Sequence, residues 1–522
     1  MKRSLRGSAI ILVFILLAAV YLAGASNQPP RSDGSTYVLL ARSLASGHGY
    51  REFPIREQPH TKYPFLLPAL FSVFQRFAPE SFYLLDILSA LLTLGSAYFV
   101  YVLLKGYFSR NTALILTTLI ALNPYTFVQY SHRATSEALF TFTSLAAVLC
   151  IEKYAAVKNR ASLAASIAAL TAACYSRQVG IILLFSAVMY FIFLKNRRGA
   201  LLVGGITAVL ILPWWSRVLL LVYYYGITPD ISFITNLPGL ARLSKFTLSV
   251  FVHASAWTHW VVFPTFFVFF RFVRGEAMAL GSALGNIKFV LTLAVALCTA
   301  LGFFRHVKRR WRIFDFYVVF YGLGICAAGN YMSYRLLYPI VPFLFYYLVT
   351  GTNDILNRVS DLSGRGRRPG AASWAKPLKV VLIGVLFCSS ILHIVHQTYG
   401  ERTGRFTRPW NAYFDAARWA KENLPDDTVI MCYKAQNFYL VSGKHSVDVP
   451  YYYHLDKLSD FFDALRILDA DYLVLTDPGF PWGDAFRKTI TPDFADLHSG
   501  AFTPVKTIQR YGGKAIIYRI HT

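Results

Sequence analysis

Apolar runs with few charges or none recur along most of this chain, and they restrict its fold more than any other feature. Examples are residues 9–24, 84–104 and 380–395. A bilayer core about 30 Å thick needs roughly 20 apolar residues in each spanning helix. Inside lipid the backbone must satisfy its own hydrogen bonds, which a helix does within one segment. The runs therefore predict a mainly α, polytopic transmembrane bundle.

The composition and the placement of charge agree with a membrane protein. Hydrophobic residues make up 55% of the 522 residues and charged residues 15%, whereas soluble proteins carry about 25% charged residues. The net charge of +25 would suit a nucleic-acid partner. However, the basic residues lie in short loops between apolar runs, and no basic face with a nucleic-acid-binding module is evident. We therefore expect no nucleic-acid partner.

We expect about eleven spanning helices, each matching the length that a bilayer requires. They lie near residues 8–25, 81–104, 111–126, 135–151, 161–176, 178–194, 200–222, 285–304, 313–329, 335–350 and 379–397. The aromatic stretch 246–275 either forms a hairpin, which raises the number to about thirteen, or lies in the outer interface. Lys2, Arg3 and Arg6 precede the first run as in a signal peptide, but the length of that run favours a retained helix.

The basic loops predict the orientation of the chain. With the N-terminus in the cytoplasm, every inside loop is basic, and the short outside connections hold single cations. An odd number of spans then puts the C-terminus outside. We expect a multi-pass protein of the plasma or inner membrane. Its transmembrane domain covers residues 1–397, with a long first external loop at 26–80, and a small external α/β domain covers 398–522.

The C-terminal domain has α/β patterning and no catalytic motif. Residues 411–424 have helical periodicity, and residues 428–432 and 471–475 read as short buried strands. Segments 504–510 and 514–519 flank two glycines, which predicts a hairpin. We expect this domain to stabilise or cap the protein or to recruit a partner. No CxxC motif or Cys/His cluster is present in the chain, so we expect no metal site.

The first external loop is the most informative segment for function. Asp33 lies just beyond the first apolar run, and Tyr37 and Leu40 follow it at helical spacing, which predicts a short interfacial helix. Residues 65–77 predict a second one. From the residues alone, Asp33 is equally well explained as a helix-capping acid, and Lys62 as an interfacial cation.

The order of motifs in this loop resembles that of the GT-C glycosyltransferases. More narrowly, it resembles the protein O-mannosyltransferase and aminoarabinose lipid A transferase superfamily. The resemblance covers roughly residues 8–350 and is carried by six segments. They are Asp-x-x-x-Tyr at 33–37, Ser-Gly-x-Gly-Tyr at 46–50, Lys-Tyr-Pro at 62–64, the turn at 131–140, Arg-x-x-Gly at 177–180 and the turn at 334–339. Mannosyltransferase relatives have Glu after the loop Asp, whereas this chain has Gly34, which argues against strict protein mannosylation.

The resemblance implies an inverting transfer of a sugar from a polyprenyl-phosphate donor at the outer face of the membrane. It implies that Asp33 is the catalytic carboxylate and that Lys62, Arg177 and Arg335 hold the donor phosphate. Supporting candidates are Tyr37, Tyr63, His132, Arg133 and Glu137. The implied partners are membrane lipids, the lipid-linked sugar and a lipid, glycan or protein acceptor. Beyond the donor substrate we expect no cofactor and no divalent metal, and hexose, pentose and amino sugars all remain open.

Other interpretations remain open beside this one. Arg133 and Glu137 have the four-residue spacing of a structural ion pair, and cations at outer helix ends often snorkel. A transporter or lipid flippase would also contain many helices and intramembrane charges, although we find no internal repeat of the kind that transporters often have. A third candidate is a non-catalytic assembly protein whose external domain binds a partner.

Overall fold

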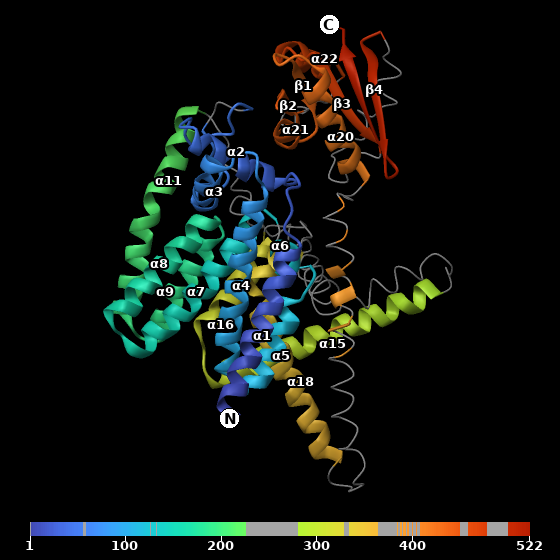
Figure 1. Ribbon diagram of the computed structural model, residues 1–522. Coiled ribbons are helices and arrows are strands. Elements are labelled where there is room, and N and C mark those ends of the chain that lie inside the picture. The colour runs from blue at the N-terminus through green and yellow to red at the C-terminus, as the bar shows by residue number, and fades with distance from the viewer. Residues whose placement is uncertain are drawn as a thin grey trace. The chain divides into compact units, whose positions relative to one another are not determined.

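The structure is a computed structural model, and it divides into two compact units (Figure 1). It describes residues 2–55, 59–125, 127–131, 133–225, 280–327, 334–363, 408–448, 458–477 and 500–521, with scattered positions between 384 and 403. The helical unit contains Met1–Ala25, Thr61–Leu67 and Asp86–His396. The mixed unit contains Ser26–His60, Pro68–Leu85 and Gln397–Thr522.

Long helices make up most of the helical unit. They are α1 (Lys2–Ala23), α4 (Tyr83–Lys105), α5 (Arg110–Ala121), α7 (Ser136–Val157), α8 (Arg160–Ser176), α9 (Gly180–Phe193), α11 (Ile206–Tyr225), α15 (Leu280–Arg309), α16 (Ile313–Ala327) and α18 (Val341–Ser363). Short elements join them: α6 (Phe127–Ser131), α10 (Arg197–Gly199), the π-helix η1 (Ala200–Gly205), α17 (Tyr334–Leu337) and the 3-10 helix η4 (Tyr338–Ile340).

Each predicted span up to residue 350 coincides with one or more of these helices. The predicted span 379–397 is described only at scattered positions, and the stretch 246–275 lies outside the described residues. Within the described residues, four helices are long and apolar enough to cross a membrane: Tyr83–Lys105, Ser136–Val157, Arg197–Tyr224 and Val290–Arg309. Four shorter apolar helices accompany them. The mainly helical membrane fold is confirmed, and the number of spans stays a prediction.

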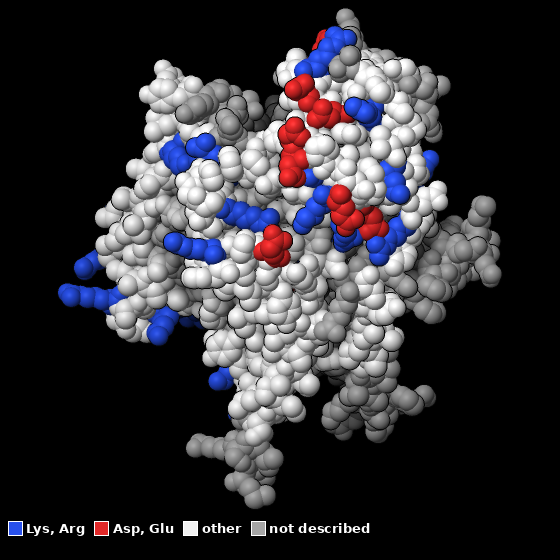
Figure 2. Space-filling view, turned by 45° about the horizontal axis from the view of Figure 1, so that its top comes forward, with Lys and Arg blue, Asp and Glu red and all other residues white. Residues whose placement is uncertain are grey.

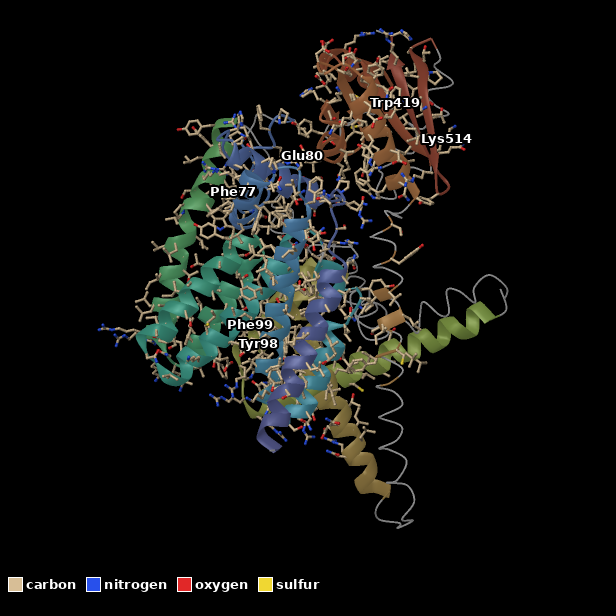
Figure 3. The ribbon with its side chains drawn as sticks, in the orientation of Figure 1. Phe77, Glu80, Tyr98, Phe99, Trp419 and Lys514 are labelled. Carbon is tan, nitrogen blue, oxygen red and sulfur yellow. The ribbon has the colours of Figure 1, made fainter. Side chains whose placement is uncertain are left out.

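The surfaces of these helices carry exposed apolar side chains where a soluble protein would carry charge. Val209 and Leu212 of α11 are 67% and 58% exposed, and Tyr98 of α4 is 51% exposed (Figure 3). Figure 2 shows a wide area of surface without charged side chains. Apolar exposure of this extent marks a surface that another apolar phase covers, and for spanning helices that phase is lipid.

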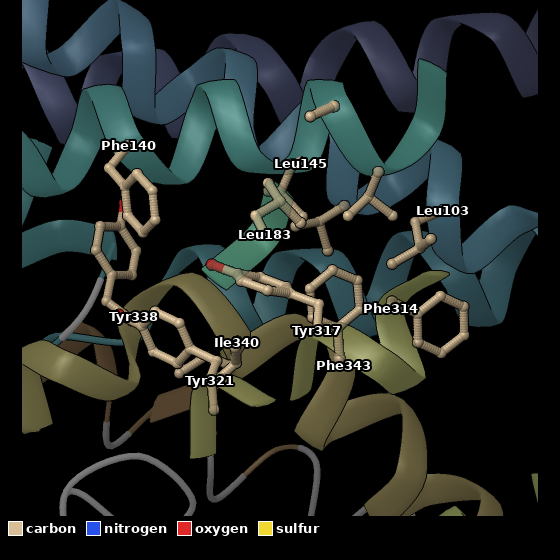
Figure 4. Close-up of a cluster of buried hydrophobic side chains, with 14 of the residues drawn as sticks. Leu103, Phe140, Leu145, Leu183, Phe314, Tyr317, Tyr321, Tyr338, Ile340 and Phe343 are labelled. Atoms are coloured by element: carbon tan, nitrogen blue, oxygen red, sulfur yellow. The ribbon is translucent and has the colours of Figure 1, made fainter. Parts of the chain in front are cut away.

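Aromatic side chains fill much of the interior of the helical unit. Tyr317, Tyr338 and Phe140 are fully buried and lie in the cluster that Figure 4 shows. A buried tyrosine usually finds a partner for its hydroxyl group, and Tyr21 of α1 donates to the carbonyl of Ala121 in α5 at 2.9 Å. The aromatic core therefore joins helices that are far apart in the sequence.

The mixed unit contains one five-stranded sheet with the order β2-β1-β3-β5-β4. The strands are β1 (Val429–Cys432), β2 (His445–Asp448), β3 (Tyr472–Asp477), β4 (Phe502–Arg510) and β5 (Gly513–Ile520). β1 pairs in parallel with β2 and β3, while β5 pairs antiparallel with β3 and β4. The predicted strands at 428–432 and 471–475 and the predicted hairpin are confirmed as β1, β3 and β4–β5.

The mixed unit also contains helices from the C-terminal segment and from the first loop. From the C-terminal segment come α20 (Arg408–Asn423), α21 (Ala435–Ser442) and α22 (Leu458–Ile467), and from the first loop come α2 (Asp33–Ala45) and most of α3 (Leu66–Phe77). Both predicted loop helices and the predicted helix at 411–424 are confirmed. α2 packs against α21, so the first loop and the C-terminal segment share one unit. Cys432 is buried in the core, and burial raises the pKa of its thiol.

Two glycines allow α15 and α18 to approach closely. A Cβ atom at Gly302 of α15 would collide with the Tyr347 carbonyl oxygen, and one at Gly351 of α18 would collide with the Cys298 carbonyl oxygen. Only glycine lets two helix backbones come this near, a form of packing that membrane helices favour.

We predict that Gly302→Ala destabilises the protein by at least about 1–3 kcal/mol, because the new methyl group meets backbone that cannot rotate away. Gly322→Ala is the matched control, because a Cβ there meets nothing within 4 Å. In a helix that change is neutral or stabilising by up to about 1 kcal/mol. Thermal unfolding of the detergent-solubilised variants measures both effects. Equal melting temperatures for the two variants would contradict the close approach.

Candidate functional site

A buried carboxylate at the start of α7 is the centre of the candidate site. The side chain of Glu137 is 1% exposed and lies in the first turn of the helix, after Thr135 at the N-cap. The positive end of the helix dipole favours an acid there. Burying an ionised carboxylate is costly unless cations and hydrogen bonds compensate it.

Two arginines from other elements supply that compensation. Arg177, at the C-cap of α8, and Arg335, in α17, both donate to Oε1 of Glu137. Their positions are 40 and 198 residues away in the sequence. Arg177 also donates to the Ser136 hydroxyl at 3.2 Å. Two positive charges thus meet one negative charge, and the ion triad retains a net positive charge.

The triad is only partly enclosed. The side chains of Arg177 and Arg335 are 21% and 27% exposed, whereas Glu137 lies beneath them. The cations therefore reach accessible space, while the acid that fixes them does not. Such an arrangement presents preoriented positive charge to an anion, and arginine suits phosphate because it can bind two oxygens at once.

The Lys-Tyr-Pro segment lies beside the same turn. The Gln178 side-chain amide donates to the Lys62 carbonyl oxygen at 2.7 Å. Three residues further along, the Phe65 ring packs against Tyr175, with 4.7 Å between ring centroids. Lys62 is exposed, and its ammonium lies 5.6 Å from the Tyr63 ring centroid. Segments 62–65 and 175–178, which carry two of the quoted motifs, therefore contact each other.

Tyrosine rings pack against the elements that carry the triad. The Tyr338 ring stacks on Tyr130 with 5.2 Å between centroids and meets Phe127 edge-on at 5.0 Å. Tyr338 directly follows α17, so this packing fixes the segment that carries Arg335. Figure 4 shows Tyr338 near Phe140 of α7 and Tyr321 of α16.

The turn before α7 also contains the candidate residues Arg133 and His132. The four-residue spacing left open an ion pair between Arg133 and Glu137, and the structure shows Glu137 paired with Arg177 and Arg335. The Arg133 carbonyl oxygen accepts a hydrogen bond from the Ser89 hydroxyl of α4 at 3.0 Å. His132 lies outside the described residues.

Asp33 belongs to the mixed unit, where it is the first residue of α2 and is partly exposed. The preceding residue, Ser32, has a φ of 56°. Tyr37, one turn along α2, is buried at 2% exposure. Because Asp33 and the cations belong to different units, the predicted approach of Asp33 to Lys62, Arg177 and Arg335 stays a prediction.

Histidines of the first loop make ordinary polar and aromatic contacts. Nδ1 of His60 lies 2.9 Å from a Glu52 oxygen, and the His48 ring stacks on Phe53. Among the residues that the structure describes, no group of three or more His, Cys, Asp or Glu side chains is placed to hold a metal ion.

An apolar groove of about 600 Å³ runs along α9. Along α9 its lining extends from Ile181, four residues after Arg177, to Ile192 near the other end of the helix, and Arg197 of α10 lines it beyond that end. Opposite residues come from η1 and α11, including Leu201 and Ala208. The groove has the apolar lining that a hydrocarbon chain requires.

The comparisons with known proteins agree on a fold. Residues 62–217 match the family described as dolichyl-phosphate-mannose-protein mannosyltransferase. Among solved structures, ArnT from Cupriavidus metallidurans bound to undecaprenyl phosphate matches with a TM-score of 0.57 and 13% identity over 98% of each chain. The apo state of ArnT matches with a TM-score of 0.55 and 14% identity, again over 98% of each chain. No curated protein sequence matches. The chain has a GT-C fold.

The family match and the structural match both include candidate residues of this GT-C chain. The matched family segment begins at Lys62 and contains Glu137 and Arg177. Asp33 and Arg335 lie outside that segment, and the structural likeness, which spans nearly the whole chain, includes the parts that hold them. The fold is thus the one that the resemblance predicted, that of ArnT, and the match to the mannosyltransferase family covers residues 62–217.

We predict that Glu137→Gln destabilises the helical unit by about 3 kcal/mol, because two guanidiniums then lose their buried counter-charge. Asp463→Asn is the control, since Asp463 and its partner Arg466 are 60% and 67% exposed. Exposed pairs contribute at most about 1 kcal/mol. Thermal unfolding in detergent reports both changes. A Glu137→Gln protein that melts with the wild type would show that the triad has no structural role.

Proposed function

We propose that this protein is a membrane glycosyltransferase that moves a sugar from a polyprenyl-phosphate donor to a hydroxyl acceptor. The observation that carries the proposal is the ion triad. It presents two preoriented guanidiniums, with Lys62 on the adjacent segment, above one buried carboxylate. A phosphate that leaves with an extra negative charge needs such fixed cations.

The donor has a long apolar tail and a charged head, and the helical unit offers a place for each. The apolar groove begins one turn after Arg177 and follows α9. Arg197 lines the groove beyond the other end of α9, so a cation lies near each end, and we place the donor phosphate at the Arg177 end because the ion triad lies there. The similar ArnT structure was solved with undecaprenyl phosphate, a lipid of this chemical class.

Asp33 is our candidate for the catalytic base. In the proposed step, the acceptor oxygen attacks the anomeric carbon from the face opposite the phosphate and passes its proton to the Asp33 carboxylate. The bond between the anomeric carbon and the phosphate oxygen breaks, and its electron pair leaves with the polyprenyl phosphate. A single displacement inverts the anomeric centre. General-base assistance of this kind typically contributes about 10²–10⁴-fold.

The basic loops support a cytoplasmic N-terminus and an external C-terminal domain, which would place this chemistry at the outer face of the membrane. Gly34 follows Asp33, where mannosyltransferase relatives carry a second acid, so a lipid or glycan acceptor fits better than a protein. The scheme applies equally to a hexose, a pentose and an amino sugar.

We predict that Asp33→Asn abolishes transfer and leaves folding and donor binding intact, because the amide keeps the size of the side chain and loses the base. Sugar transfer by purified protein in detergent, from lipid-linked donors extracted from cells that lack the protein, measures the effect. Asp427→Asn, at an exposed position of the C-terminal segment, is the control. Full transfer by folded Asp33→Asn protein would remove Asp33 from the mechanism. Lipid movement without a covalent product in the wild type would instead indicate a transporter.

We predict that Lys62→Ala weakens binding of the donor by about tenfold and leaves acceptor binding unchanged, since one charged hydrogen bond contributes about 1.5–3 kcal/mol. Lys153→Ala, an exposed lysine near the other end of α7, is the control. Equilibrium binding of a polyprenyl phosphate to each variant measures the difference. Equal donor affinities for all three proteins would show that Lys62 does not hold the phosphate.

A further inference from the structure

Two adjacent amide side chains at the start of α21 are buried. Gln436 is 8% exposed and Asn437 is 0% exposed. Buried amides persist where their donors and acceptors are satisfied. In this protein both amides find partners in the first loop, about 400 residues earlier in the chain. We call these two side chains the amide pair.

Asn437 contacts the chain on both sides of Asp33. Its Nδ2 donates to the Pro30 carbonyl oxygen at 2.7 Å, and its Oδ1 lies 3.1 Å from the Ser35 hydroxyl. The single proton of that hydroxyl is shared with the Ser32 carbonyl oxygen at 2.6 Å. Because a carbonyl oxygen can only accept, Pro30 fixes which end of the amide faces it. One side chain therefore ties together residues 30 and 35.

Between these two contacts the backbone is strained. Ser32 has a φ of 56° and a ψ of −126°, a region that residues other than glycine rarely adopt. Such a conformation persists only when its surroundings hold it. Contacts at Pro30 and Ser35 bracket Ser32, and Asp33 is the next residue. The direction of the Asp33 side chain thus depends on the backbone conformation of Ser32, which Asn437 helps to hold.

Gln436 holds the second half of the same loop. Its Nε2 donates to a Glu52 oxygen at 3.0 Å and lies 3.4 Å from an Asp448 oxygen. The other Glu52 oxygen lies 2.9 Å from Nδ1 of His60. Glu52 and His60 are 4% and 8% exposed, so this chain of contacts is shielded from water. The amide pair therefore contacts the loop at residues 30–35 and, through Glu52, at residue 60.

Hydrogen bonds from β2 and α20 hold the start of α21, which carries the amide pair. The Ala435 backbone N–H donates to the Asp448 carboxylate of β2 at 2.9 Å. The fully buried Tyr413 of α20 donates its hydroxyl to the Tyr433 carbonyl oxygen, just before α21. α21 ends at Gly443, whose φ of 69° suits glycine at a helix C-cap. The position of the two amides is thus set by the sheet and by α20.

We infer that Asn437, with Gln436 beside it, is a positioning residue for Asp33. The C-terminal segment would then serve the reaction by holding the first loop in shape, without touching substrate itself. This inference rests on the proposed function, since it needs Asp33 to act in transfer. It assigns a role to a domain in which the sequence has no catalytic motif.

The test compares Asn437→Ala and Asn437→Asp with Ser446→Ala in the full-length protein. Ser446 is 0% exposed and bonds within the C-terminal segment, to the Lys444 carbonyl oxygen at 2.9 Å. Its substitution removes a buried hydrogen bond of the same domain without contact to the loop. Asn437→Asp keeps the size of the side chain and loses the donor to Pro30. Sugar transfer gives kcat and KM, and hydrogen exchange reports the amides of α2.

Both Asn437 variants should lower kcat by about 10- to 100-fold, because small displacements of a reacting group have effects of this size. The KM for the lipid donor should change by less than about twofold, since substrate binding does not involve Asn437. Amides of α2 should exchange faster in both variants, and Ser446→Ala should match the wild type in α2 exchange and in kcat.

Three outcomes would overturn the inference: unchanged exchange in α2, faster exchange with unchanged kcat, or an equal loss of kcat in Ser446→Ala. The first is read without any activity assay. Absence of transfer by the wild type from every lipid-linked donor would instead overturn the proposed function, and the inference would fall with it. Failure of the inference alone leaves wild-type transfer and its dependence on Asp33 intact.

Discussion

The buried carboxylate of Glu137 ties together three elements of the helical unit. A charge at this depth is stable only when cations and hydrogen bonds satisfy it, and here the cations come from the end of α8 and from α17. The same ion pairs therefore hold the three elements together and set the positions of the two guanidiniums. Because the acid is buried and the arginines are partly exposed, the same contact that stabilises the fold also aims positive charge outward. Structure and proposed phosphate binding thus depend on the same ion triad.

Hydropathy predicted the helical unit well because lipid imposes both a length and a backbone requirement. The predicted span 161–176 is α8 at Arg160–Ser176, and the predicted span 81–104 is α4 at Tyr83–Lys105. Errors in the predicted helix ends arise where a helix continues beyond its apolar run. α18 continues to Ser363, beyond the predicted end at 350, because its last turns are polar and hydropathy marks only the apolar part. Pro339 lies in a short 3-10 turn between α17 and α18, which a single apolar run does not reveal.

The candidate residues were predictable one by one, whereas their contacts were not. Glu137, Arg177 and Arg335 stand out as charges near helix ends, but spacing within one helix suggested Arg133 as the partner of Glu137. Contacts across 40 and 198 residues leave no periodic signal. For a similar reason, α21 and β2 were missed: they have 8 and 4 residues, too short for a hydrophobic period. The polar residues Gln436 and Asn437 look like a loop in the sequence, and only tertiary structure shows that both are buried.

The two units use buried polar groups in the same way. In each, a side chain that would be costly to bury alone bonds to partners far away in the sequence: Glu137, through Oε1, to two guanidiniums, and Asn437 to the Pro30 carbonyl oxygen and the Ser35 hydroxyl. A hydrogen bond contributes only about 1 kcal/mol on balance, but a buried partner left without it costs more. Alternative loop conformations are thus disfavoured, because they would leave buried polar groups without hydrogen-bond partners. A strained Ser32 next to Asp33 is compatible with this principle, because the energy that holds it comes from contacts outside the loop. Such contacts would let a reactive loop be both polar and well ordered.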